Sequence, residues 1–586
     1  MQLNRAFPAM RASVAGRWKT HRDPWPGAML TIVLSGCALV AILVAAVVWM
    51  GFYEGLPGDD DREFTFDLYR RVFVDPATYR VLWTTVQFSV ISIVVACGFG
   101  IPAAWLAERT DLPGKTALFT MMTVGLLIPG FSVAMGWMFM LHHRIGVLNV
   151  WMMELFGLSR APMDIATILG MGWVEGLALT PLTFVMTSAV LRSMDPSLEE
   201  AAHMSGANTR RTILRVTLPL VWPGILAAIL YTFVIGFAAF DIPAIIGWSN
   251  RIYTFSTQLY LYVNPGEDVP RYGMSAALSG VMIPIAILLS WWYRTMQKNA
   301  ERYRVVTGKS YRPRLVRLRG RAWLAWGFLG LYLVLGQLVP VLSLLWSSFL
   351  SYFRQPSLAA IGQLSLENYR LLPWSILADA AENTAILVVA TPTCTVIASL
   401  AFSWVVLRSR YRWRGLFDFF AFLPHAVPHI IFGIGAMVLA LFVLGQTVPL
   451  YGTIWIVLIV LVLVRISYGT RVLNGALIQI HPELEEAAQM SGGNTGSVLR
   501  SVLLPILAPA MMYVWIWVAL LSYRELTLPA ILAGKYNTTV ALVVWDLWES
   551  GGLGQSSALT VLILLCFAPL LGLYWFATRR VSVVQG

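Results

Sequence analysis

PSLEEAAHMSG, residues 196–206, occurs again 286 residues later as PELEEAAQMSG, residues 482–492. The two copies are identical at 9 of 11 positions, and the wider segments 191–223 and 477–509 are identical at 16 of 33. Each copy is a short polar segment in a chain that is otherwise mostly apolar. The repeat therefore divides the chain into two halves of similar design.

The composition around this repeat is that of a membrane protein. The 586 residues are 58% hydrophobic and 12% charged, with a mean hydropathy of +0.69. Soluble domains carry roughly twice that share of charged residues. Runs of about 20 apolar residues, long enough to span a bilayer as a helix, recur along the chain. A barrel is excluded because its strands of about 10 residues would alternate in hydropathy.

About twelve apolar segments are long enough to span the membrane, six before and six after the middle of the chain. They are residues 28–52, 82–106, 116–141, 164–191, 221–246, 273–293, 322–348, 384–407, 416–444, 452–473, 506–532 and 556–577. Six is an even number, so the two halves share one orientation and form parallel repeats related by an axis along the membrane normal. The predicted fold is an all-α integral membrane protein made of two parallel six-helix repeats.

The net charge of +12 is concentrated beside apolar segments. Ten basic residues lie between Arg294 and Arg321 against one acid, Glu301, and the first 22 residues contain five more. Such basic segments are cytoplasmic by the positive-inside rule, so we expect both termini in the cytoplasm and no nucleic-acid partner. The predicted organisation is a cytoplasmic tail (1–27), a first repeat (28–297), a basic cytoplasmic linker (298–321) and a second repeat (322–586).

Signs of enzyme chemistry are missing from the sequence. The four cysteines all lie in apolar segments, where their spacing fits neither a disulfide framework nor a metal site. Gly308-Lys309-Ser310 lacks the glycine that a phosphate-binding loop requires, since Tyr303 stands there. We therefore expect no catalytic residues, no metal and no cofactor.

Each polar copy is predicted to be a short helix outside the bilayer. The acids Glu199, Glu200, Glu485 and Glu486 lie near the positive end of the helix dipole. Gly206 and Gly492 suit a left-handed helix stop. The tandem alanines between them, which form a flat face for close approach by another protein, are Ala201, Ala202, Ala487 and Ala488. So short a helix is marginal alone, which favours a partner surface.

The spacing continues beyond each glycine. E-A-A, three residues, Gly, nine residues, an aliphatic residue, one residue and L-P ends at Pro219 in the first copy and at Pro505 in the second. This pattern resembles the signature loop of the membrane subunits of bacterial ATP-binding-cassette importers, with Val216 and Val502 where that family usually has isoleucine. The resemblance implies two fused copies of a six-span permease unit in the bacterial inner membrane. It also implies two coupling helices for two copies of a cytoplasmic ATP-binding subunit, and a periplasmic solute-binding protein.

Ionisable residues inside spans are candidates for the solute pathway because burying them in a bilayer is costly. We predict that the pathway is lined by Glu175, Asp241, His429, Arg524 and Glu525. An alternative is that Arg524 and Glu525 neutralise each other and brace helix packing. Interrupted helices at Pro129-Gly130 and at Pro424–Pro428 occupy matching places in the two halves, which is typical of transport pathways. His425 and His429 are predicted to pack at the break, because the prolines disturb their i, i+4 geometry as metal ligands.

The solute is suggested by resemblance alone. Tyr523-Arg524-Glu525-Leu526 and the segment Trp545–Gly551 resemble the second half of ferric-iron importer permeases, so ferric iron is the expected cargo. Related fused permeases carry thiamine, phosphonate, polyamine or sulfate. Two other classes remain open, an ion-gradient secondary transporter with two six-span halves and a membrane scaffold that transports nothing. Co-purification with an ATPase would exclude the first, and loss of solute uptake on deletion would exclude the second.

Overall fold

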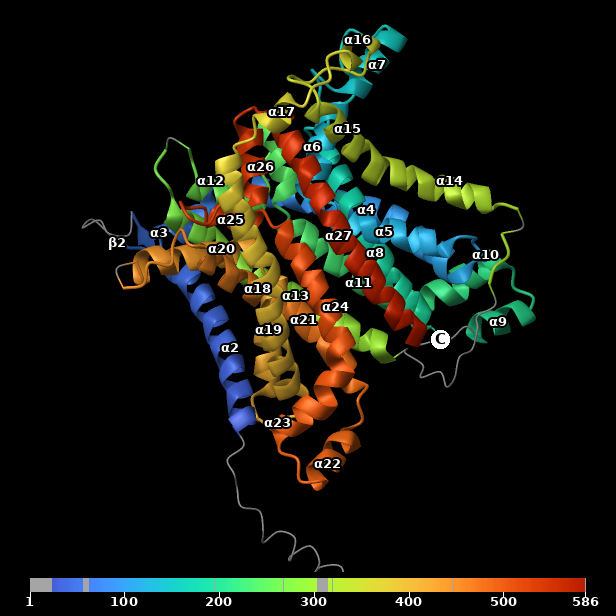
Figure 1. Cartoon of the computed structure of the whole chain (residues 1–586), viewed down its shortest axis with the longest axis vertical. Helices are drawn as coiled ribbons and strands as arrows, with labels where there is room; N and C mark the ends of the chain where they lie inside the picture. The colour runs from blue at the N-terminus through green and yellow to red at the C-terminus, as the bar shows by residue number, and fades with distance from the viewer. Residues whose placement is uncertain are drawn as a thin grey trace, which may run out of the picture.

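The first half of the chain is almost entirely helical (Figure 1). The computed structural model describes residues 24–55, 63–194, 197–266, 268–302, 315–318, 320–445 and 447–584. The elements of the first half are α2 (Pro24–Met50), β1 (Tyr53–Glu54), β2 (Glu63–Phe64), α3 (Asp67–Val74), α4 (Pro76–Arg109), α5 (Lys115–Leu127), α6 (Gly130–Leu141), α7 (Val147–Phe156), α8 (Ile168–Ser193), α9 (Ser197–Met204), α10 (Thr209–Thr212), η1 (Ile213–Thr217), α11 (Leu218–Ala238), η2 (Pro243–Gly247), η3 (Trp248–Asn250), α12 (Phe255–Val263) and α13 (Tyr272–Arg302).

The second half repeats the order of the long helices, but the short helices and strands in its loops differ from those of the first half. Its elements are α14 (Ala322–Leu333), η4 (Val334–Leu338), α15 (Val339–Ser348), α16 (Leu358–Ile361), α17 (Glu367–Arg370), α18 (Trp374–Leu407), α19 (Arg414–Ala426), α20 (His429–Val438), η5 (Leu439–Val443), α21 (Ile454–Ile478), α22 (Pro482–Met490), α23 (Thr495–Val498), η6 (Leu499–Leu503), α24 (Leu504–Tyr523), α25 (Thr527–Ile531), α26 (Val540–Glu549) and α27 (Leu553–Val584). The two short strands β1 and β2 pair antiparallel and sit on a loop. The predicted all-α fold is confirmed.

The twelve predicted segments all fall on helices, but they are not twelve straight spans. Among the described residues, eight helices are long and apolar enough to cross a membrane, and the number rises to ten if each bent pair is one span. The bent pairs are α5 with α6 and α19 with α20. The last helix of each half, α13 or α27, is long, and its first part, Tyr272–Leu288 or Leu553–Cys566, is a shorter apolar helix.

Both predicted helix interruptions are present. The axes turn by 92° between α5 and α6 and by 102° between α19 and α20. Ile128 and Val427, which precede Pro129 and Pro428, are both extended, with ψ of 123° and 132°. A residue before proline is driven out of the helical region by the proline ring, so each span stops there and restarts at the proline.

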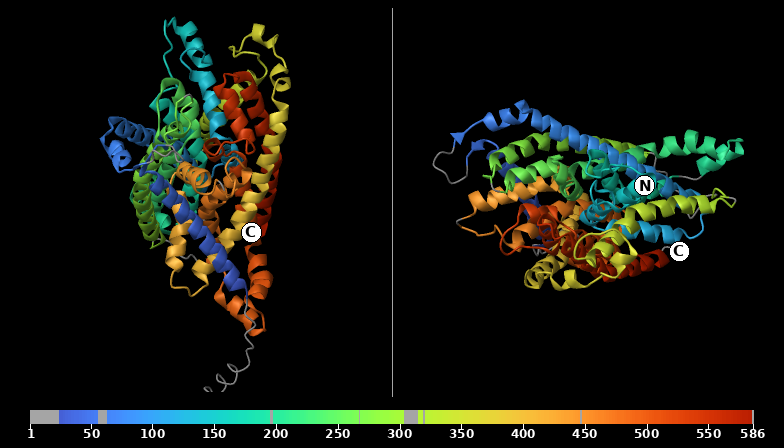
Figure 2. Two further views of the ribbon diagram at one scale, coloured as in Figure 1. Left: turned by 90° about the vertical axis from the view of Figure 1, so that its left-hand side faces the viewer. Right: turned by 90° about the horizontal axis from the view of Figure 1, so that it is seen from above.

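The first span of each half packs against the other half. Helix α2 lies along α18, α19 and α20 of the second half, and α15 lies along α6 of the first half. Figure 2 shows α2 crossing in front of the second half, with the whole molecule flattened when it is viewed from above. The two halves are therefore interleaved rather than merely joined by a linker.

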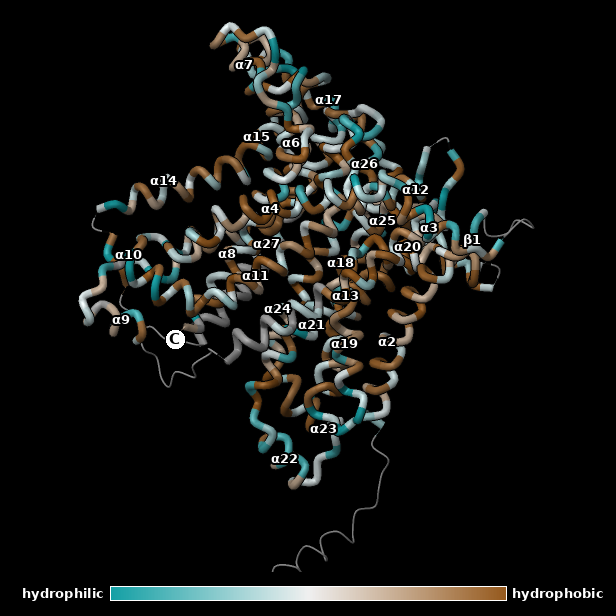
Figure 3. The backbone as a smooth tube through the Cα atoms, turned by 180° about the vertical axis from the view of Figure 1, so that it is seen from behind, coloured by the Kyte–Doolittle hydropathy of each residue, from teal (hydrophilic) through white to brown (hydrophobic). Residues whose placement is uncertain are grey.

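The two polar repeats, the start of α2 and the last residues before α14 lie at one end of the helices. The Trp25 indole at the start of α2 sits against Gly496, just beyond α22. The backbone of Val316 bonds to that of Arg109 and Asp111, at the end of α4. Figure 3 shows hydrophilic residues on α9, α10 and α22 and mostly apolar ones along the long helices. The predicted tail and linker fall largely on residues 1–23 and 303–314, outside the described residues.

Candidate functional site

The two polar repeats form short helices that project from the body of the molecule (Figure 1). Helices α9 and α22 both end in a left-handed glycine, Gly206 with φ +83° and Gly492 with φ +89°. The residue after each glycine returns a backbone hydrogen bond to an alanine of the repeat: Ala207 N to Ala202 O at 3.0 Å, and Gly493 N to Ala488 O at 3.1 Å. This closure needs a residue that tolerates positive φ, which glycine does without a steric cost.

The outer faces of the two helices are apolar and exposed in the same way. Leu198 and Met204 are 43% and 90% exposed, and their equivalents Leu484 and Met490 are 50% and 89% exposed. The exposed Ala201 and Ala487 lie between them, at a spacing of three residues that puts each trio on one helix face. Sequence reasoning identified the alanines but missed both methionines, although methionine is identical in the two copies.

The two consecutive glutamates of each helix have different surroundings. Glu199 and Glu485 turn toward the membrane helices, where their side chains are only 14% and 12% exposed and lie beside arginines. Glu486 is exposed, whereas Glu200 and the second alanines, Ala202 and Ala488, are partly buried. The repeat thus presents an apolar outer face and an acidic inner one.

A cavity of about 310 Å³ lies between the two halves, and all five predicted pathway residues line it. Glu175 comes from α8, Asp241 follows α11, and His429 begins α20. Arg524 and Glu525 follow the end of α24, where the helix stops at Tyr523. Residues far apart in the sequence therefore meet at one place, which the sequence alone did not establish.

Arg524 and Glu525 do not pair with each other. The Arg465 guanidinium on α21 bonds to Glu525 at 2.6 Å, and both side chains are largely buried. Arg524 donates instead to the carbonyls of Leu126 and Ile128 in the other half, at 2.8 and 3.2 Å. Those carbonyls lose their helical partners because α5 ends at the proline break. The two adjacent side chains thus have separate hydrogen-bond partners, and Arg465 is a cavity residue whose pairing was not predicted.

The local twofold axis that relates the halves passes through this cavity. Thr527 Oγ1 lies 3.4 Å from Asp241 Oδ1, and the two residues are 286 positions apart, the spacing of the repeat. Equivalent positions of two copies can touch only near the axis that relates them. The charged residues around it differ between the halves, since Arg524 and Glu525 correspond to Ala238 and Ala239.

The cavity has more uncompensated acid than base. Among the described residues, neither Glu175 nor Asp241 has a basic group within ion-pair distance, and Glu175 has no hydrogen-bond partner although it is 6% exposed. The rings of Tyr231 and His425 stack at 4.4 Å across the two halves, so His425 packs at the break. In the described part of the chain, no three His, Cys, Asp or Glu side chains are arranged to hold a metal ion. The cavity is acidic without being a preformed chelating site.

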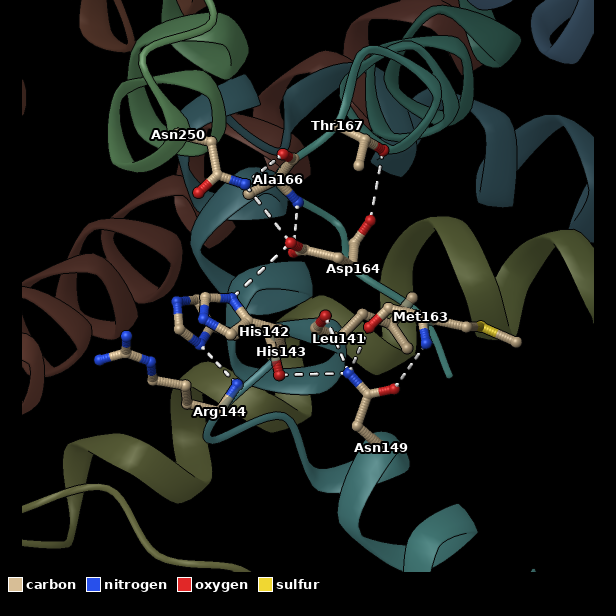
Figure 4. Close-up of polar contacts among 10 residues, drawn as sticks. All are labelled: Leu141, His142, His143, Arg144, Asn149, Met163, Asp164, Ala166, Thr167 and Asn250. Atoms are coloured by element: carbon tan, nitrogen blue, oxygen red, sulfur yellow. Dashed lines mark hydrogen bonds and ion pairs between the residues drawn. The ribbon is translucent and has the colours of Figure 1, made fainter. Parts of the chain in front are cut away.

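A network of polar contacts connects α6, α7 and the loop before α8, at the end of the first half that lies opposite α9. Figure 4 shows Asn149 of α7 donating to the carbonyls of Leu141 and His142 at the end of α6 and to that of Met163 in the loop before α8. Asp164 in that loop accepts from the Ala166 amide at 2.9 Å. Burial and the neighbouring His143 lower the pKa of His142. These contacts fix the short helix α7 to the start of α8.

The sequence matches a known family in both halves. The model for the binding-protein-dependent transport system inner membrane component matches residues 97–302 and again residues 383–583. The ferric transport system permease protein of Actinobacillus pleuropneumoniae is 26% identical over 83% of this chain and 68% of its own length. An Fe(3+)-transport system permease protein of Haemophilus influenzae is 24% identical over 80% of this chain and 84% of its own length.

More distant relatives carry other names. The galactooligosaccharides transport system permease protein of Bacillus subtilis is 25% identical over 39% of this chain and 56% of its own length. One solved structure is also similar, the crystal structure of a bacterial ABC transporter involved in the import of the acidic polysaccharide alginate. The match covers 51% of the present chain and 98% of the chain in that structure, with 17% sequence identity and a TM-score of 0.32. The chain belongs to the family of binding-protein-dependent transport system inner membrane components, permeases of ABC importers that leave ATP hydrolysis to a separate subunit, and it contains that permease unit twice.

Proposed function

We propose that this chain is the complete membrane pathway of an ATP-driven importer, with α9 and α22 as coupling helices for two copies of an ATPase subunit. The observation that carries the proposal is the duplicated outer face, in which Met204 and Met490 are about equally exposed at equivalent positions. Two nearly identical faces on one chain suit two copies of the same partner. An exposed methionine at the end of a short helix is an adaptable apolar contact for a groove.

The proposed orientation follows from the same helices. ATPase subunits are cytoplasmic, so the end with α9, α22, Trp25 and Val316 faces the cytoplasm, and both termini are on that side. The opposite end then receives solute from a periplasmic binding protein across the bacterial inner membrane. A cysteine at the exposed Arg412 should react only from the cytoplasm and one at the exposed Phe66 only from outside. If the cysteine at position 66 reacted from the cytoplasm, the proposed orientation would be wrong.

The proposed cargo is ferric iron. Two relatives aligned over most of the chain are ferric transport permeases, and the cavity on the twofold axis has two carboxylates with no basic group within ion-pair distance among the described residues. Buried carboxylates of this kind attract a cation, since burying an unpaired charge is costly. In this proposal Glu175, Asp241, His429, Arg524 and Glu525 line the path.

The proposal is tested by blocking the outer faces. The double variant Ala201→Trp/Ala487→Trp should lower the amount of ATPase that co-purifies with the permease and abolish ATP-dependent uptake of radioactive ferric ion, while membrane insertion stays normal. Gly206→Val and Gly492→Val should act in the same direction, because a β-branched residue is strained at positive φ.

Different outcomes separate the parts of the proposal. Wild-type ATPase content and uptake in the double tryptophan variant would reject the coupling helices. Uptake that needs an ion gradient but no ATP would indicate a secondary transporter. ATP-driven uptake of another solute in place of ferric ion would overturn the cargo and leave the importer intact.

A further inference from the structure

We propose that Arg109 and Arg408 are positioning residues that link each coupling helix to the membrane helix leading to the cavity. The inference rests on the proposed function, because it assigns a mechanical role to contacts inside the coupling segment. Neither arginine lies in the repeated polar stretch. Each stands at the end of the second long helix of its half, far from that stretch in sequence.

In the second half, Arg408 directly follows α18 and holds both sides of the connection between α21 and α22. Its Nε is 2.5 Å from Glu485 Oε1 in α22. Its Nη2 donates to the carbonyl of Leu477 at 3.0 Å and to that of Ile480 at 2.7 Å, at the end of α21. One guanidinium thus joins three helices, α18, α21 and α22.

In the first half, Arg109 makes two corresponding contacts, one to the glutamate and one to a helix-end carbonyl. It is the last residue of α4 and only 4% exposed. Its Nε lies 3.2 Å from Glu199 Oε2 in α9, and its Nη2 donates to the carbonyl of Leu191 at 2.9 Å, near the end of α8.

The acceptors that the two sets share are equivalent, whereas the Ile480 carbonyl is an acceptor in the second half only. Glu199 and Glu485 are 286 positions apart, as are Leu191 and Leu477. A contact pattern that occurs twice in one chain, between corresponding elements, is not the accident of one packing arrangement.

The chemistry explains why arginine stands at both places. The last carbonyls of a helix have no partner within the helix, and a cation near a helix C-terminus is favourable. Arginine has a planar fork of donors, so it can hold carbonyls with one edge and a carboxylate with the other. Lysine, a single point charge, cannot hold both in fixed geometry.

We call the contacts of Arg109 and of Arg408 the two arginine clamps. The helices α8 and α21 that they hold also line the cavity. Arg109 holds the end of α8, which carries Glu175, and Arg408 holds the end of α21, which carries Arg465. Movement of α9 or α22 on a partner would therefore be passed to the cavity-lining helix directly. Without the clamp, the short connection could bend and absorb the movement.

The first half has one additional contact. The Thr217 hydroxyl donates to Glu199 Oε1 at 2.6 Å, whereas the position equivalent to Thr217 is Leu503. Glu199 would remain anchored if Arg109 were lost, but Glu485 has no such second anchor in the described part of the chain. We therefore expect the second half to depend more strongly on its arginine.

The test separates docking from transmission. In a chain whose native cysteines are serine, Leu521→Cys places a thiol on the cavity, and the measurement is the change in its labelling rate when ATP is added to the permease–ATPase complex. Arg408→Gln should keep at least half of the wild-type amount of co-purified ATPase but reduce the ATP-dependent change in labelling at least fivefold.

Arg109→Gln should reduce the ATP-dependent change in labelling by a smaller factor. Glu485→Gln should reproduce the effect of Arg408→Gln while the arginine still caps the carbonyls of Leu477 and Ile480. Arg410→Gln, an equal loss of charge at an exposed site two residues on, is the matched control.

The outcomes are distinguishable from failure of the importer proposal. If the unmutated chain binds no ATPase, the proposed function fails. If it binds ATPase and its labelling responds to ATP, a full response in Glu485→Gln overturns the clamp. Additive defects of Arg408→Gln and Glu485→Gln would overturn it as well, because residues that act through one contact are not additive. If Arg408→Gln does not assemble, Glu485→Gln alone decides.

Discussion

At the scale of single residues, the most exposed large apolar side chains of the proposed coupling helices are two methionines. Met204 and Met490 are 90% and 89% exposed, more than most apolar side chains of this chain. Each Met→Glu change introduces a charge where we propose an apolar groove, so co-purified ATPase should fall at least tenfold in the double variant. Leu358→Glu is the matched control, since Leu358 is 91% exposed at the opposite end. Equal losses in the variant and the control would contradict docking at these residues.

Among the cavity residues, the ion pair of Arg465 and Glu525 allows stability to be separated from transport. Losing one partner of a buried pair typically costs about 3–5 kcal/mol, because the other charge remains unpaired. Glu525→Gln should therefore lower the midpoint of thermal unfolding of the detergent-solubilised complex. Adding Arg465→Gln should recover most of that stability. A pathway role predicts that ferric uptake stays low in the double variant, whereas recovery of uptake together with stability would reduce the pair to a structural brace.

The sequence predicted which residues are unusual, but not which of them meet. Glu175, Asp241 and Arg524 stood out because ionisable groups are rare in spans. Their convergence depends on how α8, α11 and α24 pack around the twofold axis, which no local pattern encodes. Arg109 and Arg408 gave no signal at all, since an arginine at the end of a span looks like an ordinary cytoplasmic flank.

At the scale of helices, two glycines permit the interleaving of the halves. A Cβ on Gly136 in α6 would lie 2.4 Å from Cα of Pro340 in α15, and one on Gly435 in α20 would lie 2.5 Å from the Leu43 carbonyl in α2. Backbone atoms cannot move aside cheaply, so Gly136→Ala and Gly435→Ala should each destabilise the protein by about 1–3 kcal/mol.

The matched controls are glycines inside other membrane helices, in open surroundings. Gly98 in α4 and Gly327 in α14 have no atom within 4 Å of an added Cβ. Alanine there should be neutral or slightly stabilising, because glycine inside a helix costs roughly 0.5–1 kcal/mol relative to alanine. Thermal unfolding of the four variants checks the expectation. Equal midpoints for all four would show that the helix crossings tolerate a methyl group.

The helix breaks were predictable because proline acts locally, whereas the span count was not. Pro129 and Pro428 disfavour the helical conformation of the residue before them, although other prolines, such as Pro102 and Pro392, lie inside continuous helices. A hydropathy pattern, however, gives the same signal for a straight span and for two helices at a right angle. For segments 116–141 and 416–444, the prolines predicted the breaks, but neither the prolines nor the hydropathy predicted the angles of 92° and 102° between the two parts.

At the scale of the whole molecule, the duplicated sequence explains both the symmetry and its limits. Polar stretches, helix breaks and clamp contacts are all present twice, so the two ends of the proposed coupling machinery are alike. Around the axis the halves differ, with Arg524 and Glu525 at the positions that correspond to Ala238 and Ala239 of the other repeat. A single fused chain allows such differences, because each half can specialise while its partner is always the other half.

The interleaved packing predicts that covalent continuity between the halves is dispensable. Helix α2 packs on the second half and α15 on the first, so separating the halves would require both to leave apolar surfaces. With a protease site inserted after Thr307 and cut in the purified protein, the two fragments should co-purify in detergent, with the amount of bound ATPase unchanged. The physical reason is that helices held by extensive apolar packing and by Arg524 across the axis need no tether. A matched insertion that lacks the cleavage sequence controls for the added residues. Dissociation of the fragments on cleavage would show that the linker, not the exchange of first spans, holds the two repeats together.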